Sequence, residues 1–339
     1  MTNKAKNNRY SRQVLFSPIG QMGQAHLSKS HVLLVGCGAL GTGIADGLVR
    51  AGVGQLSIVD RDFVEESNLQ RQTLFSEKDA KNKLPKAIAA QARLLAINSS
   101  VKVIPYVEDA TVDFFEQNSQ GVDLILDATD NFETRFIIND ICMKYHIPWV
   151  YGACLGSYGT SFTIIPGETP CFNCLVKVVP LGDATCDTVG IIAPAVQMVV
   201  AYQTAEALKI LSGNRSAVRQ KIVSFDLWEN MQTGIDISKM KNKACLSCGE
   251  NPTYPYLSFK NRTKVAILCG RQAVQIRPPQ SELDLDEVAQ RLNAKKLNDY
   301  LIFFVSGDKS MTLFKDGRAI IQGTNDIREA KNFYHRYLG

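Results

Sequence analysis

The sequence lacks the features that identify secreted, nucleic-acid-binding and membrane-spanning proteins. Its first residues, MTNKAKNNRY, contain no apolar run, so no secretory signal peptide is expected. The net charge is only +5, and no long basic block follows the arm from Lys4 to Arg12. The most apolar long segment, 191–211, is broken by polar side chains and is typical of a buried helix, not of a membrane span. We therefore expect a cytoplasmic protein that binds neither membranes nor nucleic acid.

Histidine is scarce as well, since the chain has four and none lies in a motif. Nine cysteines are present, but disulfides are rare in cytoplasmic proteins and none is expected here. The 339 residues are 45% hydrophobic and 21% charged, as in an ordinary globular protein. This length allows one large α/β domain and a small second domain.

A glycine-rich turn stands between two apolar runs near the start of the chain. The stretch 32–60 reads as strand, turn, helix and strand, and it ends in Asp60. Gly36, Gly38 and Gly41 form the pattern GxGxxG, in which glycines let the backbone approach a phosphate at a helix start. Asp60 follows the second strand, where an acid can bind a ribose hydroxyl. The stretch predicts a nucleotide site and favours a dinucleotide, but NAD, FAD and ATP all stay open.

Polar and basic residues follow at positions that suit a phosphate. The loop after Asp60 contains SNLQRQ at 67–72, at the carboxyl end of a strand, where ligands bind in such sheets. A polar surface loop is the alternative. A helix is predicted over 86–97, with Pro85 in its first turn. Lys86 would then oppose the helix dipole, which a shared phosphate would explain, unless it is an ordinary exposed lysine.

Two acids follow the apolar strand predicted over 122–128. Asp127 and Asp130 lie in the sequence DATDN, and two carboxylates beside a nucleotide can hold Mg²⁺. We assign Asp127 to structure. For Asp130 the alternative role is that of N-cap of a helix over 131–145.

The remaining strands indicate a mixed sheet. They are predicted over 147–153, 161–166 and 221–227. The link between the first two is too short for a crossover helix, so they should pair antiparallel, whereas the strands before them should be parallel.

Four of the cysteines form two Cys-x-x-Cys pairs, and these four are Cys171, Cys174, Cys245 and Cys248. Four thiolates fill all positions of a tetrahedral zinc ion and leave none open for water. The pairs are much further apart than in a zinc ribbon, so the metal would tie two distant segments together. A thioredoxin-like redox site is the alternative, but it needs only one such pair. We therefore predict structural zinc.

Six ordered motifs together resemble the bacterial ubiquitin-activating-type family. They are GCGALG, the acid at Asp60, SNLQRQ, the lysine of LPK, DATDN and the paired Cys-x-x-Cys, and they extend over roughly Arg9 to Pro255. The family includes the adenylyltransferases for the small subunit of molybdopterin synthase and for the thiamine sulfur carrier protein. The resemblance implies an α/β fold with a Rossmann-like mixed sheet, helices on both faces, a homodimer, ATP, Mg²⁺ and structural Zn²⁺.

The resemblance also implies roles for individual residues. Asp130 would hold Mg²⁺ and be most needed for the chemistry, with Arg71 and Lys86 at the phosphates. Arg12 would reach the nucleotide of the partner subunit. Cys186 matches an acceptor thiol that only some members use covalently, and a loop thiol without a catalytic role is the alternative. The nucleotide would contact Gly36, Gly38, Gly41, Asp60, Ser67, Asn68, Leu69, Gln70, Arg71, Lys86, Asp130 and Asn131.

The implied reaction is the adenylation of a protein carboxylate. The C-terminal glycine of a small ubiquitin-like sulfur carrier ending in Gly-Gly would attack the α-phosphate of ATP and release pyrophosphate. Its carboxylate is already ionised at neutral pH, so no general base is needed. The adenylate would later give a thiocarboxylate, with sulfur from another protein such as a sulfurtransferase or a cysteine desulfurase.

Three questions stay open at this point. Overall motif likeness favours the molybdopterin-synthase subunit, and thus molybdenum cofactor biosynthesis, over the thiamine carrier. An NAD-dependent oxidoreductase would explain the glycine turn and Asp60 but not SNLQRQ, Lys86 or the cysteine pairs. A non-catalytic binding module would not be expected to retain both Arg71 and Asp130.

The last part of the chain departs from the short adenylyltransferases. We place an adenylyltransferase domain at 1–252 and a small α+β extension at 253–339. The extension reads as β-α-β-β-β-α, with an Asp-Gly hairpin signal at 315–317. Longer relatives carry a rhodanese sulfurtransferase domain here, which this segment, with Cys269, does not match. The sequence assigns no role to the extension.

Overall fold

The computed structural model describes residues 9–175, 190–258, 265–268, 272–276 and 283–338. Contacts between residues divide the chain into two units. The first comprises 1–77 and 85–261, and the second comprises 78–84 and 262–339. The short segment 78–84 therefore belongs with the C-terminal part of the chain, although the residues on both sides of it belong to the first unit.

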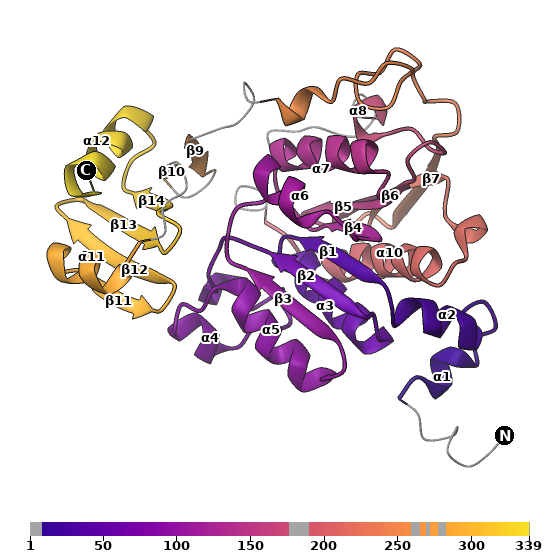
Figure 1. Ribbon diagram of the computed structural model, residues 1–339, viewed down its shortest axis with the longest axis horizontal. Coiled ribbons are helices and arrows are strands. Elements are labelled where there is room, and N and C mark those ends of the chain that lie inside the picture. Colours follow the sequence, from indigo (N-terminus) through magenta and orange to yellow (C-terminus); the bar gives the residue numbers. More distant parts are fainter. Residues whose placement is uncertain (1–8, 176–189, 259–264, 269–271, 277–282, 339) are drawn as a thin grey trace. The chain divides into compact units, whose positions relative to one another are not determined.

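An eight-stranded mixed sheet forms the centre of the first unit, in the order β3-β2-β1-β4-β5-β6-β7-β8 (Figure 1). The first five strands in this order are parallel and the last three are antiparallel. The antiparallel pairing of β5 with β6 confirms the expectation from their short link. The bounds are β1 His31–Val35, β2 Gln55–Val59, β3 Lys102–Tyr106, β4 Leu124–Asp127, β5 Trp149–Leu155, β6 Tyr158–Ile164, β7 Lys221–Asp226 and β8 Met231–Asp236.

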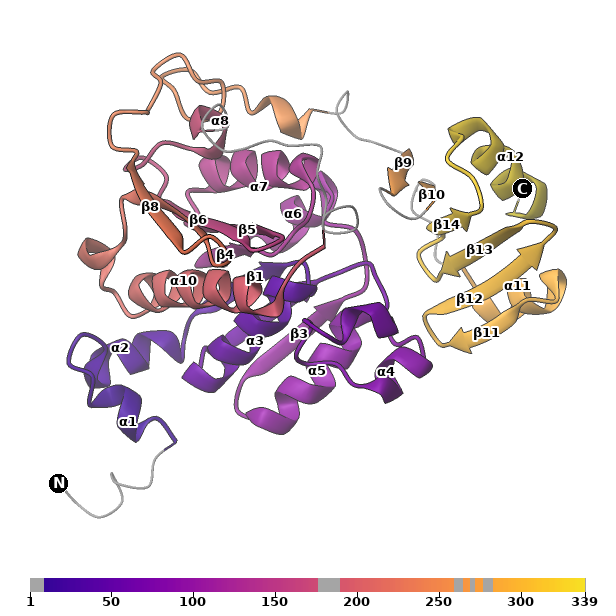
Figure 2. The same cartoon turned by 180° about the vertical axis from the view of Figure 1, so that it is seen from behind.

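Helices cover both faces of this sheet (Figures 1 and 2). One face carries α3 (Ala39–Ala51), α5 (Lys86–Ile97) and α10 (Ala193–Leu211), and the other carries α6 (Val112–Asn118), α7 (Phe132–Tyr145) and α8 (Phe172–Leu175). Short helices α1 (Ser11–Val14) and α2 (Gly20–Leu27) precede β1, and the 3-10 turns η2 (Glu66–Asn68), η3 (Arg215–Ala217) and η4 (Pro255–Leu257) lie in loops. Within the described ranges, no helix has the length and apolar character needed to cross a membrane.

Buried strands and aromatic rings hold the first unit together. The strands β1 and β4 are apolar almost throughout and buried on both faces, as parallel strands between two helical layers must be. On the α7 side, the ring of Phe172 packs 5.4 Å from Tyr151 and 5.5 Å from Trp149. Burying a ring of this size contributes about 1.5–3 kcal/mol. These contacts fix α8, which contains Cys174 and directly follows Cys171, against the sheet.

The second unit is built on a six-stranded antiparallel sheet, in the order β11-β12-β13-β14-β10-β9. Two helices, α11 (Leu285–Leu292) and α12 (Ile327–Leu338), share one hydrophobic core with it. The segment α4 (Glu77–Lys81) begins at the boundary between the units. The strands are β9 Val265–Leu268, β10 Ala273–Ile276, β11 Lys295–Asn298, β12 Leu301–Ser306, β13 Lys309–Phe314 and β14 Ala319–Gln322.

The predicted β-α-β-β-β-α pattern recovers most of this sheet but omits β9 and β11. Both omitted strands are edge strands of four residues, and β11 reads KKLN, without an apolar alternation. The Asp-Gly signal is confirmed, because β13 and β14 form a hairpin and Gly317 has φ +80°.

Candidate active site

Three loops meet at the carboxyl ends of neighbouring strands. The order β2-β1-β4 brings together the glycine turn after β1, Asp60 after β2 and the DATDN loop after β4. The chain runs outward from β1 to β2 and β3, and then returns to the other side of β1 with β4. Such a reversal of strand order opens the crevice in which open α/β sheets bind ligands.

The glycine turn is fitted to the loop after β4. Gly36 has φ +92°, and a Cβ at this position would lie 2.6 Å from the carbonyl oxygen of Ala128. Gly38 begins α3 with φ −87°, and a Cβ here would meet only the Gln72 amide nitrogen at 3.8 Å. Gly36 is therefore required for packing, whereas Gly38 keeps space open before the first free N–H groups of α3.

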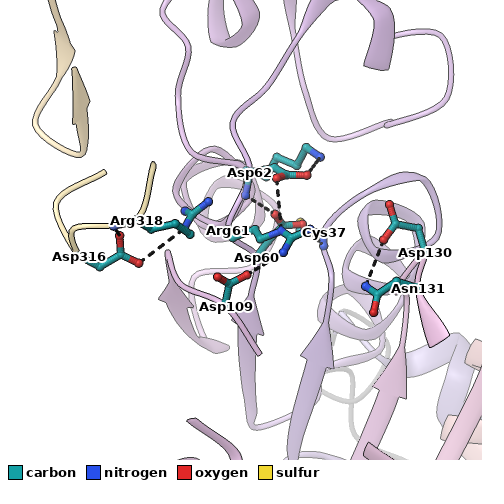
Figure 3. Close-up of polar contacts among 10 residues, drawn as sticks. Cys37, Asp60, Arg61, Asp62, Asp109, Asp130, Asn131, Asp316 and Arg318 are labelled. Atoms are coloured by element: carbon teal, nitrogen blue, oxygen red, sulfur yellow. Dashed lines mark hydrogen bonds and ion pairs between the residues drawn. The ribbon is translucent and has the colours of Figure 1, made fainter. Parts of the chain in front are cut away.

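Asp60 holds the glycine turn in place (Figure 3). Its Oδ2 accepts a 2.6 Å hydrogen bond from the backbone N–H of Cys37, and its Oδ1 accepts one of 2.7 Å from the N–H of Asp62. Burial raises the pKa of Asp60, and the nearby Lys86 opposes that shift. Two oxygens offer more acceptor positions than these two bonds use, so a ribose hydroxyl can still be bound.

Lys86 is buried at the first residue of α5, with only 6% of its surface exposed. Its Nζ lies 3.1 Å from Asp62 Oδ2, and its backbone N–H donates to the Asp62 carbonyl at 2.8 Å. Burial alone would lower the pKa of Lys86, but Asp62, Asp60 and Asp130 together raise it. The alternative of an ordinary exposed lysine is therefore wrong.

A second cation, Arg61, extends this cluster (Figure 3). Its Nη1 lies 3.0 Å from Asp109 Oδ1, and Asp109, Asp62 and Asp130 raise its pKa against the effect of burial. Sequence reasoning missed Arg61, although it lies in the run Asp60-Arg61-Asp62. Alternating charges at the carboxyl end of a buried strand were the available signal.

The DATDN loop is braced by Arg135 from α7. Arg135 is buried, its Nε lies 3.2 Å from Asp127 Oδ2, and its Nη2 donates to the Thr129 carbonyl at 2.7 Å. The Thr129 N–H and hydroxyl both donate to Asp127 Oδ1, at 2.8 and 2.6 Å. Asp127 thus folds the loop, in agreement with its structural assignment. Arg135 was not singled out from the sequence.

Asp130 does not cap the following helix. The N-cap of α7 is Asn131, whose Oδ1 accepts the backbone N–H of Thr134 at 2.9 Å, so the N-cap alternative for Asp130 is wrong. Asp130 remains exposed, and its charge raises the pKa values of Lys86, Arg61 and Arg135. It is therefore an exposed carboxylate close to the cationic part of the site, and its Oδ1 accepts a 3.4 Å hydrogen bond from Asn131 Nδ2 (Figure 3).

In the SNLQRQ segment, some side chains hold the loop by hydrogen bonds and one buried oxygen has no hydrogen-bond partner within the described residues. Asn68 is buried and its Oδ1 accepts the Glu65 N–H at 3.2 Å in a capping box, while Arg71 Nη1 donates to the Ser67 carbonyl at 2.9 Å. Gln72 is 4% exposed, and its Oε1 has no hydrogen-bond partner within the described residues. A buried amide oxygen without a partner next to Gly38 fits a site completed by a polar ligand.

Arg12 lies at the opposite end of α3 from the glycine turn. It is exposed on α1, which Gln13 ties to the C-terminal end of α3 by a 2.9 Å bond from its Nε2 to the Ala51 carbonyl. A helix of this length measures about 20 Å. The structure therefore does not bring Arg12 to the site of its own chain. Cys186 lies outside the described residues.

The four cysteines of the two pairs converge beside the sheet. Cys171 and Cys174 lie at α8, and their Sγ atoms are within 4.8 Å of those of Cys245 and Cys248. Contacts between the pairs measure 3.6 Å for Cys171 with Cys245 and 3.5 Å for Cys174 with Cys248. Thiolates bound to a tetrahedral zinc ion at about 2.3 Å lie about 3.8 Å apart. The cluster fits a zinc ion.

Comparison with known proteins decides the family. The model of the ThiF family matches residues 10–247, well over half of the chain. The chain belongs to the ThiF family. This ThiF-family protein is 50% identical over 336 residues to the sulfur carrier protein ThiS adenylyltransferase of Bacillus subtilis (strain 168), which covers 98% of this chain and 99% of that one. It is an adenylyltransferase.

Other ThiF-family relatives are more distant. The sulfur carrier protein adenylyltransferase of Thermus thermophilus is 34% identical, over 74% of this chain and 93% of that one. The adenylyltransferase and sulfurtransferase MOCS3 of Danio rerio is also 34% identical, over 72% of this chain and 53% of that one. The crystal structure of E. coli MccB with ATP covers 74% of this chain and 76% of its own, with a TM-score of 0.62 and 22% identity, which supports the fold alone.

Proposed function

We propose that this protein adenylates the C-terminal glycine of a ThiS-type sulfur carrier in thiamine biosynthesis. The observation that carries the proposal is the meeting of the glycine turn, Asp60 and the DATDN loop at the β1–β4 reversal of strand order, with the buried cation of Lys86 and the charge of the exposed Asp130 close enough to interact. The relative that matches this chain over its whole length acts, by its name, on ThiS, whereas the MOCS3 proteins match only part of it. We therefore replace the preference for the molybdopterin-synthase subunit with the thiamine alternative, and we do not retain the oxidoreductase.

In this proposal ATP lies across the glycine turn. The ribose is bound at Asp60, and the phosphates lie along the start of α3, where Gly38 leaves room beside the first N–H groups of the helix, while Gly36 and Gly41 let the turn pack closely behind it. Lys86 and Arg71 face the phosphates, with Asn68 and Asn131 shaping the loops around them. The buried Gln72 Oε1 has no hydrogen-bond partner within the described residues, which supports the binding of a polar ligand beside Gly38.

The reaction needs positioning and charge more than proton transfer. The carrier carboxylate attacks the α-phosphate in line, an acyl-adenylate forms, and pyrophosphate leaves. Asp130 would hold Mg²⁺, which supplies positive charge at the phosphates. Lys86 is kept protonated by Asp62 and Asp60, so its charge is available throughout the physiological pH range. The attacking carboxylate is already ionised, so no histidine is required.

A homodimer is part of this proposal. Arg12 is tied to the far end of α3 in its own chain, so it can act on a nucleotide only in a partner subunit. A two-fold dimer would give each site one arginine from the other chain.

Zinc at Cys171, Cys174, Cys245 and Cys248 is proposed as structural. All four thiolates are needed to complete the coordination, so no position remains for chemistry. Purified protein should contain about one zinc ion per chain by atomic emission, and metal-free protein should lose stability. Protein that is fully folded and active without metal would contradict this role.

Carrier-dependent ATP–pyrophosphate exchange tests the proposed function. The purified enzyme is assayed with ThiS, with the molybdopterin-synthase small subunit, and with each carrier lacking its last glycine. We expect exchange with intact ThiS and none with the truncated carriers. Exchange only with the molybdopterin subunit would overturn the choice of carrier, and exchange with neither would overturn the function. Whether Cys186 takes part can be read from a Cys186→Ala variant, which should still catalyse exchange if its thiol acts only after adenylation.

A further inference from the structure

Two adjacent polar residues of α7 are fully buried on the face of the sheet that carries the cysteine cluster. Asn139 and Asp140 both have 0% of their surface exposed, and Ile138 and Ile141 flank them in the sequence. Burying a carboxylate among apolar groups is costly unless hydrogen bonds satisfy its oxygens. The proposed adenylation uses neither side chain, so the burial of this pair needs a separate explanation.

Asn139 is bonded to the first Cys-x-x-Cys pair. Its Oδ1 accepts a 2.8 Å hydrogen bond from the backbone N–H of Phe172, which stands between the two cysteines of that pair. Its Nδ2 donates to Asp140 Oδ1 at 3.1 Å, so both ends of the amide are used. The ring of Phe172 also packs 5.3 Å from the ring of Phe136, one turn earlier on α7. The first pair is therefore held on α7 by both polar and apolar contacts.

Asp140 is bonded to the second Cys-x-x-Cys pair and to the segment that follows it. Ser247 stands between the two cysteines of this pair, is 1% exposed, and donates a hydrogen bond from its hydroxyl to Asp140. Asp140 Oδ2 accepts the backbone N–H of Tyr256, in η4, at 2.9 Å. With Asn139, these groups supply three uncharged donors to the buried carboxylate, which offsets the cost of its burial.

The two cysteine pairs are also bonded directly to each other. Asn173, the second residue between the cysteines of the first pair, donates from its Nδ2 to Ser247 Oγ at 3.2 Å. The bonds now form a closed cycle, because Phe172 and Asn173 are neighbours in the chain. This hydrogen-bond cycle comprises the Phe172 N–H, Asn139, Asp140, Ser247 and Asn173. Neither pair can move away from the other, or from α7, without breaking a member of the cycle.

We propose that Asn139, Asp140, Asn173 and Ser247 are positioning residues of the zinc site, and that their hydrogen-bond cycle slows the release of the ion. The proposal rests on the proposed binding of zinc by the four cysteines. Three Sγ–Sγ distances in the cluster measure 3.5, 3.6 and 3.8 Å, so the thiols stand close to the spacing that the ion needs. Groups that orient metal ligands by hydrogen bonds commonly account for 10–100-fold in metal affinity.

Two variants open the cycle at different points, and a third is the control. Ser247→Ala removes the hydroxyl with little change in volume, and Asn139→Leu removes both bonds of the amide at similar size. Thr163→Val is the matched control, because the buried Thr163 hydroxyl donates to Glu206 Oε2 at 3.1 Å and joins β6 to α10. This bond lies on the opposite face of the sheet from α7 and α8, so its loss costs a buried hydrogen bond without touching the cycle.

The full chain, loaded with zinc, is used for two measurements. The first is the rate of zinc transfer to an excess of the chelating dye 4-(2-pyridylazo)resorcinol at neutral pH, and the second is the Tm of the loaded protein. We expect zinc release about 10-fold faster than in wild type for Ser247→Ala and for Asn139→Leu, because the cysteine pairs separate more easily. Thr163→Val should have a lowered Tm but should release zinc at the wild-type rate.

Wild-type zinc release in Ser247→Ala would overturn the proposal, and this variant decides alone if Asn139→Leu does not fold. Release that follows the Tm in all three variants, Thr163→Val included, would show a merely structural role and would also overturn it. Wild-type protein that binds no zinc would overturn the zinc site itself and this proposal with it. Neither measurement needs ATP or a carrier protein, so a failure of carrier-dependent pyrophosphate exchange would count against the proposed adenylation alone.

Discussion

Asp130 is the carboxylate whose loss should abolish activity without unfolding the protein. It is exposed, it does not cap α7, and its charge raises the pKa values of Lys86 and Arg61. Asp130→Asn should lower carrier-dependent pyrophosphate exchange by about 100-fold or more, as for the loss of one charge-stabilising group, with an unchanged Tm. Glu116→Gln, at an exposed acid paired with Lys144, is the control and should keep full activity. An active Asp130→Asn enzyme would remove Asp130 from the metal site.

Arg135 should matter for stability in a way that depends on pH. Arg135→Ala leaves Asp127 buried without its cation, which costs about 3–5 kcal/mol at neutral pH. Burial already raises the pKa of Asp127, Arg135 opposes that shift, and the variant raises the pKa further. The native state then binds a proton that the unfolded chain does not, so the variant becomes less stable as pH rises from 5 to 8.

Urea unfolding at pH 5 and pH 8 measures this effect. Exposed Arg93→Ala provides the control and should change the free energy of unfolding by less than about 0.5 kcal/mol at both pH values. A loss of stability in Arg135→Ala that is equal at pH 5 and pH 8 would show that Asp127 does not titrate in this range.

The sequence predicted which residues lie in the candidate site better than it predicted their burial and their ion-pair partners. The positions of Asp60, Lys86 and Asp130 followed from local motifs, because each stands at the end of a strand or the start of a helix. The burial of Lys86 and the partner of Arg61 could not be foreseen, since Asp62 and Asp109 lie 24 and 48 positions away from them. Asp130 and Asn131 are both good helix caps and adjacent, so the choice between them needed the structure.

At the scale of elements, two residues of the glycine turn have different roles: Gly36 is needed for packing, and Gly38 is proposed to make room for the ligand. Gly36→Ala would place a Cβ against the Ala128 carbonyl at φ +92°, and we expect a loss of about 1–3 kcal/mol in the free energy of unfolding. Gly38→Ala has negative φ and open space, and only its ψ of −140° lies outside the usual β range, so it should cost less than Gly36→Ala, about 1 kcal/mol. It should instead raise the dissociation constant of ATP on the order of tenfold, because the second glycine admits the phosphates.

Chemical unfolding and ATP calorimetry on both variants check this division. Equal stability losses in the two variants, or normal ATP binding by Gly38→Ala, would contradict it.

The strands of the parallel half were predictable because each is an apolar run between helices. The strands β8, β9 and β11 were not, because they are edge strands, and where their side chains are described they are largely exposed.

At the scale of the whole molecule, the proposed dimer makes a quantitative prediction. Arg12→Ala and Asp130→Ala should each be inactive alone, because each breaks every site. Random mixing gives half of the dimers as hybrids with one intact site of two, so activity should recover to about one quarter of wild type. Exchange assays on the unfolded and co-refolded mixture measure this. No recovery, with hybrid dimers shown by mass spectrometry, would place Arg12 outside the partner's site.

The division of the chain into units lay beyond sequence reasoning. The predicted boundary at 252–253 follows a change in motif content, whereas the structure also assigns 78–84 to the second unit. Within that unit the Asn298 side chain donates to the Lys83 carbonyl from 215 positions away, and no local pattern marks such a pair.

The cysteine cluster has a consequence for the order of events during synthesis. Cys171 and Cys245 are 74 positions apart, and the chain between them contains α10 and the strands β7 and β8. The five parallel strands and the helices α3, α5, α6 and α7 are complete before Cys171 is made, so they can begin to fold on the ribosome, whereas α10 is made later. The two cysteine pairs can meet only after Cys248 has left the exit tunnel, and capture of the proposed zinc ion would then close a long loop in one step. Cells short of zinc should therefore accumulate chains that are folded in the first half and open to proteases in the second.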